Sequence, residues 1–414
     1  MNILITGIHG FVGSNLVKAL APHHTIYGLD IVQPEKEGVV ATFGWDALDE
    51  LSAESLKLRE VGIDAVIHLA GKAHDTRNKS AAEVYFKVNT GLTKRIFDWY
   101  EAQPRARKFI FFSTAKAAAE CVPENSPEVR AESLERGDRS FEYGVPVLTE
   151  DVTPTPKGPY GESKIEAEEY ILDFLEGQGV TRQQMCSRVP EGLELRGESL
   201  ELRGEGLELR GESLEGGGND SLSSKPSTFN SKRVYIFRPC MIHGPGNKGN
   251  LNLLYGVVKK GIPWPLGAYE NRRTFTSVGN VCFAVSGVLG GDERLMINDK
   301  RLMINDVQVP DVPSGIYNLG DDDALSTNEL IGVICEALGK RARIWRIPQA
   351  LMNAVATLGG WLHLPLNPLR MQKLTENYVS SNAKIKQALG IECFPIDARE
   401  GLRETIEWFR LHDE

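Results

Sequence analysis

The sequence predicts an α/β fold, a doubly wound parallel sheet with helices on both faces, together with a smaller mixed α/β domain in the second half of the chain. Apolar runs at 2–6, 25–30, 64–69 and 108–113 have the length and the β-favouring residues of buried strands. A stretch with helical periodicity, 82–100, lies between two such runs. Strands that alternate with helices form parallel sheets, and we expect the later run 234–237 to complete this one.

Composition excludes several classes of protein. The chain has 414 residues, 41% of them hydrophobic and 25% charged, and a net charge of −9, which argues against a nucleic-acid-binding surface. Its six cysteines include no C-x-x-C pair, so we expect neither a disulfide framework nor a metal site, and a cytoplasmic location. The longest apolar stretch, 351–366, is interrupted by glycine and histidine, so no membrane span is expected.

One segment, 181–231, departs from the pattern. A seven-residue unit rich in leucine and glutamate repeats from Leu193, Leu200 and Leu207, and a Gly- and Ser-rich run follows. Its leucine spacing is not that of a coiled coil, and the glycine in each unit costs about 1 kcal/mol in a helix. We predict a disordered insertion outside both domain cores, with short β-hairpins as the alternative.

Two further stretches interrupt the expected domains. The sequence RLMIND occurs twice, at 294–299 and 301–306, as a tandem duplication would leave it. Residues 122–146 are interpreted as another insertion. The expected division is a doubly wound domain formed by 1–180 with 232–240, the insertion 181–231, and a mainly substrate-binding domain formed by 241–414.

A glycine pattern follows the first strand. Gly7, Gly10 and Gly13 stand between this strand and a helix, where glycine lets the backbone approach a pyrophosphate and the helix N-terminus supplies N–H donors. Asp30 ends the next strand, where a carboxylate binds ribose hydroxyls and repels a 2′-phosphate. Together they predict a dinucleotide site that prefers NAD to NADP, although the glycine pattern alone also occurs in plain strand–turn–helix units.

A second pattern combines tyrosine, lysine and threonine. Tyr160 and Lys164 share one face of a helix, where a nearby ammonium lowers the pKa of a phenol. Thr114 follows a strand and would lie at the carboxyl edge of the sheet, where ligands of such folds bind. The three predict an acid/base site, whereas the tyrosine and lysine alone are also compatible with a surface pair.

Several segments, taken in order, resemble the extended short-chain dehydrogenase/reductase superfamily and, within it, the NAD-dependent epimerase/dehydratase family, which acts on nucleotide sugars. The resemblance covers roughly 1–120, 147–180 and 232–414 and implies a Rossmann-like fold. The matching segments are GIHGFVG (7–13), DAVIHLAG (64–71), Asn89, FFST (111–114), YGESK (160–164), RPCMIHGPGNKGN (238–250) and NRRTFTSV (271–278).

The resemblance implies a role for each matching residue. The catalytic residues would be Thr114, Tyr160 and Lys164. The NAD-binding residues would be Gly7, Gly10, Phe11, Val12, Gly13, Asp30, Asp46, Leu69, Ala70, Gly71, Asn89, Tyr160, Lys164 and Pro239. The residues that bind the nucleotide-diphosphate sugar would be Thr114, Asn250, Leu251 and Arg273, with Arg272 as a rival to Arg273.

The family includes several reactions. Its 4,6-dehydratases carry an Asp-Glu pair after the catalytic threonine, and Ala115 and Lys116 stand there instead. We therefore expect a 4-epimerase of a UDP-hexose or UDP-N-acetylhexosamine in polysaccharide biosynthesis. A 4-ketosugar reductase is the alternative, and a non-catalytic dinucleotide sensor or scaffold is the alternative from another class. A homodimer is compatible with the sequence.

Other residues carry simpler interpretations. His68 lies inside an apolar run and is expected to be a hydrogen-bonded core residue. His243 stands where the family has tyrosine and is interpreted as packing. Gly279 replaces the usual aspartate of the family, which leaves one helix cap without its expected residue. His74 follows a strand and is a weaker candidate for the sugar pocket.

Overall fold

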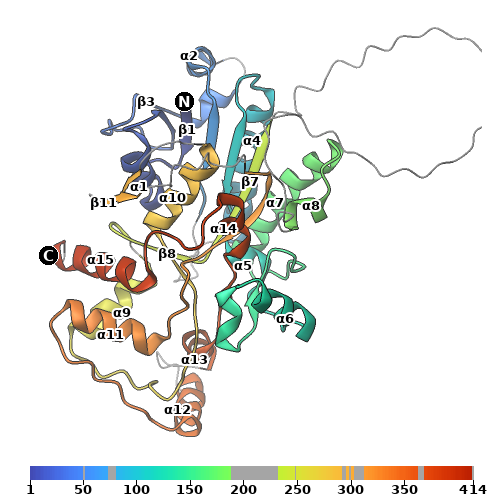
Figure 1. Ribbon diagram of the computed structural model, residues 1–414. Helices are drawn as coiled ribbons and strands as arrows, with labels where there is room; N and C mark the ends of the chain where they lie inside the picture. Colours follow the sequence, from blue (N-terminus) through green and yellow to red (C-terminus); the bar gives the residue numbers. More distant parts are fainter. Residues whose placement is uncertain are drawn as a thin grey trace, which may run out of the picture.

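A seven-stranded parallel sheet forms the centre of the protein. The computed structural model describes residues 1–49, 52–72, 81–187, 232–247, 249–290, 295–297, 300–302, 312–361 and 368–412 (Figure 1). The strand order is β12-β7-β5-β4-β1-β2-β3, which is the doubly wound arrangement predicted from the sequence. The strands are β1 (Asn2–Thr6), β2 (Thr25–Leu29), β3 (Ala41–Phe43), β4 (Ala65–His68), β5 (Lys108–Phe112), β7 (Arg233–Pro239) and β12 (Gly315–Leu319).

Helices cover both faces of this sheet because its strands are apolar on both sides. In β1, Ile3 and Ile5 pack into the core on one face and Leu4 into the core on the other, as the period of two requires. The first face carries α1 (Phe11–Leu20), α10 (Val278–Leu289) and α14 (Ala383–Leu389). The second carries α2 (Ala53–Val61), α4 (Leu92–Ala102), α7 (Pro159–Gly177) and α8 (Arg182–Cys186).

The second part of the molecule lies beyond the carboxyl edge of the sheet (Figure 1). Its main core is formed by α9 (Asn250–Lys259), α11 (Thr327–Ala337) and α15 (Ala398–Leu411). The spacing of Ser326 and Glu329 in the sequence predicts a capping box before α11, and the structure has it: each side chain accepts the backbone N–H of the other residue. Below it lie α12 (Gln349–Trp361) and α13 (Pro368–Thr375), at the end farthest from β1 (Figure 1).

No helix within the described ranges is long and apolar enough to cross a membrane. The remaining elements are short. The helical ones are η1 (Trp45–Leu48), α3 (Ala82–Tyr85), η2 (Phe86–Gly91), α5 (Ala115–Ala118), α6 (Pro127–Glu135) and η3 (Arg139–Tyr143). The strand pairs are β6 (Val147–Leu148) with β13 (Val379–Ser380), β8 (Met241–His243) with β9 (Phe275–Ser277), and β10 (Leu295–Ile297) with β11 (Lys300–Leu302). The last pair joins the two RLMIND copies in one antiparallel hairpin.

The sheet departs from the expected boundary at 240. Its edge strand β12 comes from the half of the chain assigned to the substrate domain, and it pairs in parallel with β7. The helices α10 and α14, from the same half, pack on the sheet. The sequence does not reveal this return, because GIYNL is five residues long and its partner β7 lies about 80 residues earlier in the chain.

The two expected insertions also differ from the structure where it describes them. Residues 181–187 form α8, whose Met185 is fully buried against β12 and β7, so the expectation of little burial is wrong for this part. The rest of 181–231 lies outside the described residues. Residues 122–146 are integral, since Phe141 is buried with Val147 and Asp138 accepts a hydrogen bond from Ser381.

A buried ion pair joins α7 to the sheet. The guanidinium of Arg238 on β7 donates to both carboxylate oxygens of Glu168 on α7, at 2.5 to 3.1 Å, and Ser113 at the end of β5 donates to the same carboxylate. Arg238 and Glu168 are 2% and 0% exposed. Burial alone would lower the pKa of Arg238, but Glu168 raises it above its usual value. The guanidinium therefore stays charged, and its bonds to Glu168 hold α7 against the ends of β5 and β7.

We expect Glu168→Gln to lower the free energy of unfolding by about 3 kcal/mol, because it leaves a buried guanidinium without its counter-charge. Urea unfolding followed by circular dichroism measures this change. The matched control is Glu166→Gln on the same helix, which breaks an exposed pair with Lys94 and should cost less than about 1 kcal/mol. Equal losses for the two variants would contradict a structural role for the buried pair.

Candidate active site

The glycine loop after β1 lies at the point where the strand order reverses, between β1 and β4. Gly7 has a positive φ of 68°, and a Cβ there would lie 3.0 Å from the backbone of Ala70 in the loop after β4. A Cβ on Gly13 would lie 2.6 Å from the carbonyl oxygen of Gly7. Only glycine therefore lets these two loops close upon each other and upon the start of α1.

The start of α1 is open to a ligand. Gly10 is its N-cap and contributes no side-chain cap, so the backbone N–H groups of the first turn, which includes Phe11, Val12 and Gly13, have no capping partner in the described chain. The ring of Phe11 approaches the loop at Gly244 and Gly246 from the second domain. This arrangement suits an anionic group bound at a helix N-terminus.

Thr6 and the buried His68 hold the loop after β4 in place. Thr6 accepts the backbone N–H groups of Leu69 and Ala70 at 3.1 and 3.0 Å and bonds Nδ1 of His68 at 2.7 Å. The other ring nitrogen of His68 bonds Thr93 at 2.9 Å. Burial lowers the pKa of His68 well below its usual value, and Lys164 adds to the effect. His68 is thus a neutral, hydrogen-bonded core residue, as expected from the sequence.

Two carboxylates stand at the carboxyl ends of neighbouring strands. Asp30 follows β2, and its oxygens accept the backbone N–H groups of His9 at 3.2 Å and Ile31 at 2.7 Å, which fixes the carboxylate beside the glycine loop. Asp46, exposed in η1, follows β3, the strand beside β2. Both lie on the side of the loop where a bound dinucleotide would place its adenosine half.

Asn89 connects the loop after β4 to α7. It sits in η2, a π-helical turn of the kind that often marks functional sites. Its side-chain oxygen accepts the N–H of Lys72 at 2.7 Å, and its amide donates to Ser163 at 3.0 Å. A Cβ on Gly71 would lie 3.0 Å from this oxygen and 3.3 Å from Nζ of Lys164. The bonds of Asn89 thus hold the loop against the helix that carries Tyr160.

Tyr160 and Thr114 meet side by side. Tyr160 lies in the first turn of α7 and Thr114 is the N-cap of α5, and their side chains share a hydrogen bond. Burial raises the pKa of Tyr160, the bond from Thr114 acts in the opposite direction, and Tyr85 raises it further. The phenol is therefore protonated at neutral pH, and the hydroxyl of Thr114 bonds its oxygen.

Lys164 lies one turn further along α7 and is 5% exposed. Its Nζ donates to the carbonyl oxygen of Phe112 at 2.8 Å. Burial lowers its pKa to about 8, although Glu168 opposes this shift. The pKa of Tyr160 is raised and not lowered as expected, and the ammonium of Lys164 is directed to the carbonyl of Phe112.

The residues described so far follow one another along the carboxyl edge of the sheet, in a row that we call the catalytic line. It runs from the glycine loop through Ala70 and Gly71 to Lys164, Tyr160 and Thr114, all along the carboxyl edge of the sheet. The close backbone approach at Gly7, the uncapped start of α1 and the fixed Asp30 fit a dinucleotide pyrophosphate and ribose. Pro239 ends β7 at the same edge, and it is buried.

Basic side chains stand on the second domain's side of this line. Arg272 is bound to Glu329 at 2.8 Å, whereas Arg273 donates to the carbonyl of Lys373 at 2.9 Å and pairs with Glu376 at 3.7 Å. Lys116 pairs with the same glutamate at 3.8 Å. Lys116 and Arg273 thus face the same carboxylate. Lys116 was not among the predicted substrate-binding residues, and its position two residues after Thr114 was the available signal.

The remaining predicted residues have different outcomes. Leu251 is 1% exposed and packs in the core of the second domain, so only its backbone, in the first turn of α9, is left for a ligand. Of Asn250 the structure describes only the backbone, and His74 lies outside the described residues. His243 is buried and bonds Thr405 at 3.0 Å, consistent with packing. Asp321 accepts the N–H of Ser277 at the start of α10 and so replaces the missing cap near Gly279.

Comparison with known proteins identifies relatives of this chain. Residues 3–183 match the model of the NAD dependent epimerase/dehydratase family. A UDP-glucose 4-epimerase of Vibrio cholerae is 24% identical over 357 residues, which cover 84% of this chain and 78% of that protein. The N-acetyl-alpha-D-glucosaminyl-diphospho-ditrans,octacis-undecaprenol 4-epimerase of Escherichia coli O157:H7 is 20% identical over 427 residues, covering 99% and 96%. The crystal structure of a UDP-glucuronic acid 4-epimerase from Bacillus cereus in complex with NAD matches with a TM-score of 0.60 and 15% identity over 100% of both chains.

Proposed function

We propose that this chain, whose residues 3–183 match the model of the NAD dependent epimerase/dehydratase family, is an NAD-dependent 4-epimerase of nucleotide-diphosphate sugars. The observation that carries the proposal is the bonded pair of Tyr160 and Thr114, one helical turn from Lys164 and in line with the glycine loop. Both curated relatives described above are 4-epimerases by name.

The residues of the chain have separate tasks in this reaction. NAD, when bound, supplies the hydride acceptor and donor. Tyr160 must first release its own proton to solvent; as the phenolate it takes the proton of the sugar hydroxyl at C4 and later returns it, and Thr114 holds the phenol oxygen and the hydroxyl in one hydrogen-bonded set. Lys164 places a positive charge beside them. Arg273 and Lys116 are the cations that would bind the diphosphate, for which a guanidinium fork is suited.

The competing reactions differ in what they need. A dehydratase needs an acid and a base next to the threonine, and the chain has the buried Ala115 and the ion-paired Lys116 there. A 4-ketosugar reductase would use the same three catalytic residues with an exchangeable cofactor and remains the alternative. A non-catalytic sensor would not need the acid/base set, so the complete set supports an enzyme.

We expect the chain to bind NAD much more tightly than NADP, since a 2′-phosphate would face the carboxylate of Asp30. Asp30→Ala should narrow this preference, because it removes the repulsion and leaves Lys36, which bonds Ser14 at 2.9 Å, as a nearby cation. Calorimetric titration with each cofactor measures the ratio of the NAD and NADP affinities. Glu35→Ala, an exposed carboxylate in the same loop, is the control, and equal wild-type affinities for the two cofactors would refute the assignment.

The pKa of Lys164 predicts the alkaline limb of the pH profile. Since burial lowers this pKa to about 8, the ammonium is lost as the pH rises through that value, and kcat should fall there. In Lys164→Arg the guanidinium should stay charged over this pH range, so the alkaline fall in kcat should disappear. Lys164→Met has no cation at this position and should be slow at every pH. Initial rates between pH 6 and 10, with circular dichroism as the folding control, test this. A wild-type limb that survives in Lys164→Arg would assign it to another group.

Tyr160→Phe should preserve NAD binding and lower turnover by about 10²–10⁴-fold, because it removes only the proton carrier. Tyr170→Phe, on the same helix, is the control and should leave turnover unchanged. Chromatography of UDP-hexoses and UDP-N-acetylhexosamines after incubation detects C4 isomers. An epimerase forms them without net loss of NADH, and a reductase consumes one NADH per ketosugar. Near-normal turnover of Tyr160→Phe would exclude this tyrosine as the acid/base.

A further inference from the structure

The outer face of α12 is apolar and open to solvent. Leu351, Val355 and Leu358 follow one another at helical spacing and are 56%, 45% and 54% exposed. The helix, Gln349–Trp361, contains no charged residue. Its opposite face is the one that packs, with Met352 and Ala356 buried in a small core. A water-facing stripe of this kind is unusual, because exposed helix faces are normally polar.

The segment before α12 extends this apolar face. Trp345 is 57% exposed, and its backbone N–H bonds the carbonyl oxygen of Trp264 at 2.8 Å, which places residues 262–267 alongside 343–346. Ile262, in that neighbouring segment, is 52% exposed. Gln349 and Tyr269 tie the start of α12 to the same segment. The helix, Trp345 and Ile262 therefore belong to one surface, which we call the apolar end.

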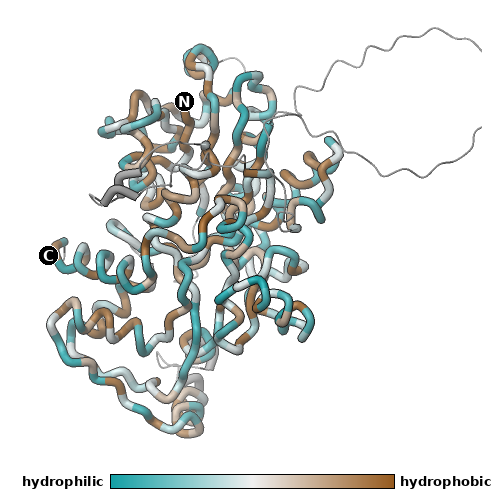
Figure 2. Tube along the Cα trace, viewed as in Figure 1, coloured by the Kyte–Doolittle hydropathy of each residue, from teal (hydrophilic) through white to brown (hydrophobic). Residues whose placement is uncertain are grey.

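Cations flank the apolar end on the side of the segment that precedes α12. Residues 340–361 include Lys340, Arg341, Arg343 and Arg346 and no aspartate or glutamate, although the chain as a whole has a net charge of −9. The three arginines are exposed and form no ion pair within the described part of the chain. In Figure 2 the chain that leads into α12 is teal at several positions and α12 is mostly pale to brown, at the end of the molecule opposite α2.

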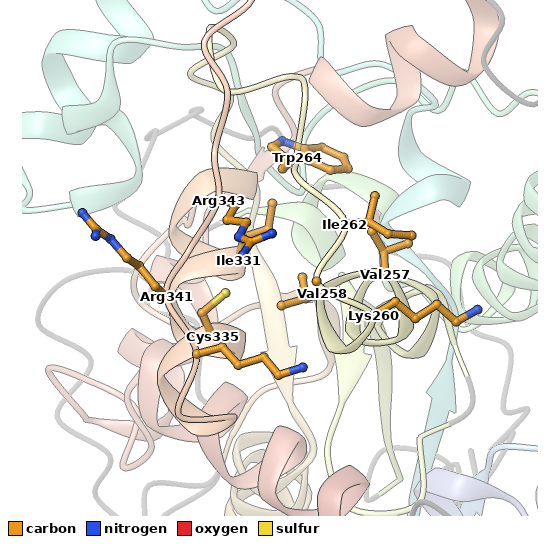
Figure 3. A pocket seen from close by; sticks show the side chains of 11 residues that line it. Val257, Val258, Lys260, Ile262, Trp264, Ile331, Cys335, Arg341 and Arg343 are labelled. Carbon is orange, nitrogen blue, oxygen red and sulfur yellow. The ribbon is translucent and has the colours of Figure 1, made fainter.

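A basic hollow adjoins this surface. Its volume is about 410 Å³, and it lies between the carboxyl ends of α9 and α11, away from the catalytic line. Lys260, Arg341 and Arg343 border it, with Ile262 and Trp264 at the apolar side (Figure 3). The hollow offers positive charge next to exposed apolar side chains, which is the combination that a lipid phosphate and its acyl chains would meet.

We propose that the apolar end docks on the surface of an anionic phospholipid bilayer, with α12 and Trp345 in the headgroup region and the arginines on lipid phosphates. An apolar helix face flanked by arginines and a tryptophan is typical of helices that lie in a membrane interface. A second copy of the chain is a poorer occupant, because a two-fold contact would bring the same unpaired arginines together. This surface is independent of the proposed reaction.

Sedimentation of the full-length protein with vesicles tests the proposal. We expect binding to vesicles of phosphatidylcholine with phosphatidylglycerol, much weaker binding to phosphatidylcholine alone, and release in 0.5 M salt. Leu351→Glu with Leu358→Glu should weaken binding by about tenfold or more. Replacing Arg341, Arg343 and Arg346 by alanine should weaken it by about fivefold per arginine.

The controls separate this surface from the catalytic site. Leu56→Glu changes a leucine that is 60% exposed on α2, at the other end of the molecule, and should leave vesicle binding unchanged. All surface variants should keep the wild-type rate on soluble nucleotide sugars. Absence of binding to anionic vesicles, or binding that none of the α12 and arginine variants weakens, would overturn the proposal. A shift to monomers in the α12 variant, with vesicle binding unchanged, would instead identify the face as an interface between copies.

Discussion

The carboxylate of Glu168 and the guanidinium of Arg238 meet inside the protein, and the catalytic geometry depends on their contact. Glu168 lies one turn beyond Lys164 and two turns beyond Tyr160 on α7. Its partners, Arg238 and Ser113, come from the ends of β7 and β5, the strands that deliver Pro239 and Thr114. A buried ion pair with several hydrogen bonds tolerates little displacement of either partner, because separating them would leave an unpaired charge in an apolar interior. The helix that carries the tyrosine and the strand that carries the threonine are therefore set against each other.

The same burial determines the chemistry of the titratable groups. Desolvation lowers the pKa of Lys164 to about 8 and raises that of Tyr160, so the two groups titrate farther apart than they would in water, and the lysine loses its proton first as the pH rises. Each group has a hydrogen-bond partner: the carbonyl of Phe112 bonds the lysine, and the hydroxyl of Thr114 bonds the tyrosine. Beside them, Asn89 keeps the loop at Gly71 and Lys72 closed on α7.

The second half of the chain contributes both to the central sheet and to a separate lobe. It completes the sheet through β12 and covers one face with α10 and α14, and it also builds the separate lobe of α9, α11 and α15. Arg273 joins these parts, because its backbone pairs with Leu325 and its side chain bonds the end of α13. Through α13 the basic part of the catalytic cleft is connected to the lobe that carries the apolar end. An enzyme docked by that end would be held at the membrane by its substrate side.

The sequence by itself determined the features that depend on local patterns. Apolar runs predicted five of the seven sheet strands, glycine spacing predicted the loop at Gly7, and Ser326 with Glu329 predicted the start of α11. These are decided within a few residues by side-chain period and turn chemistry. Only the tertiary structure decided that β12 pairs with β7, that Glu168 meets Arg238 across 70 residues, that Arg272 is held by Glu329 while Arg273 turns to α13, and that Lys164 is directed to Phe112. Such contacts depend on which distant segments the packed sheet brings together, and a single chain's pattern carries no record of that choice.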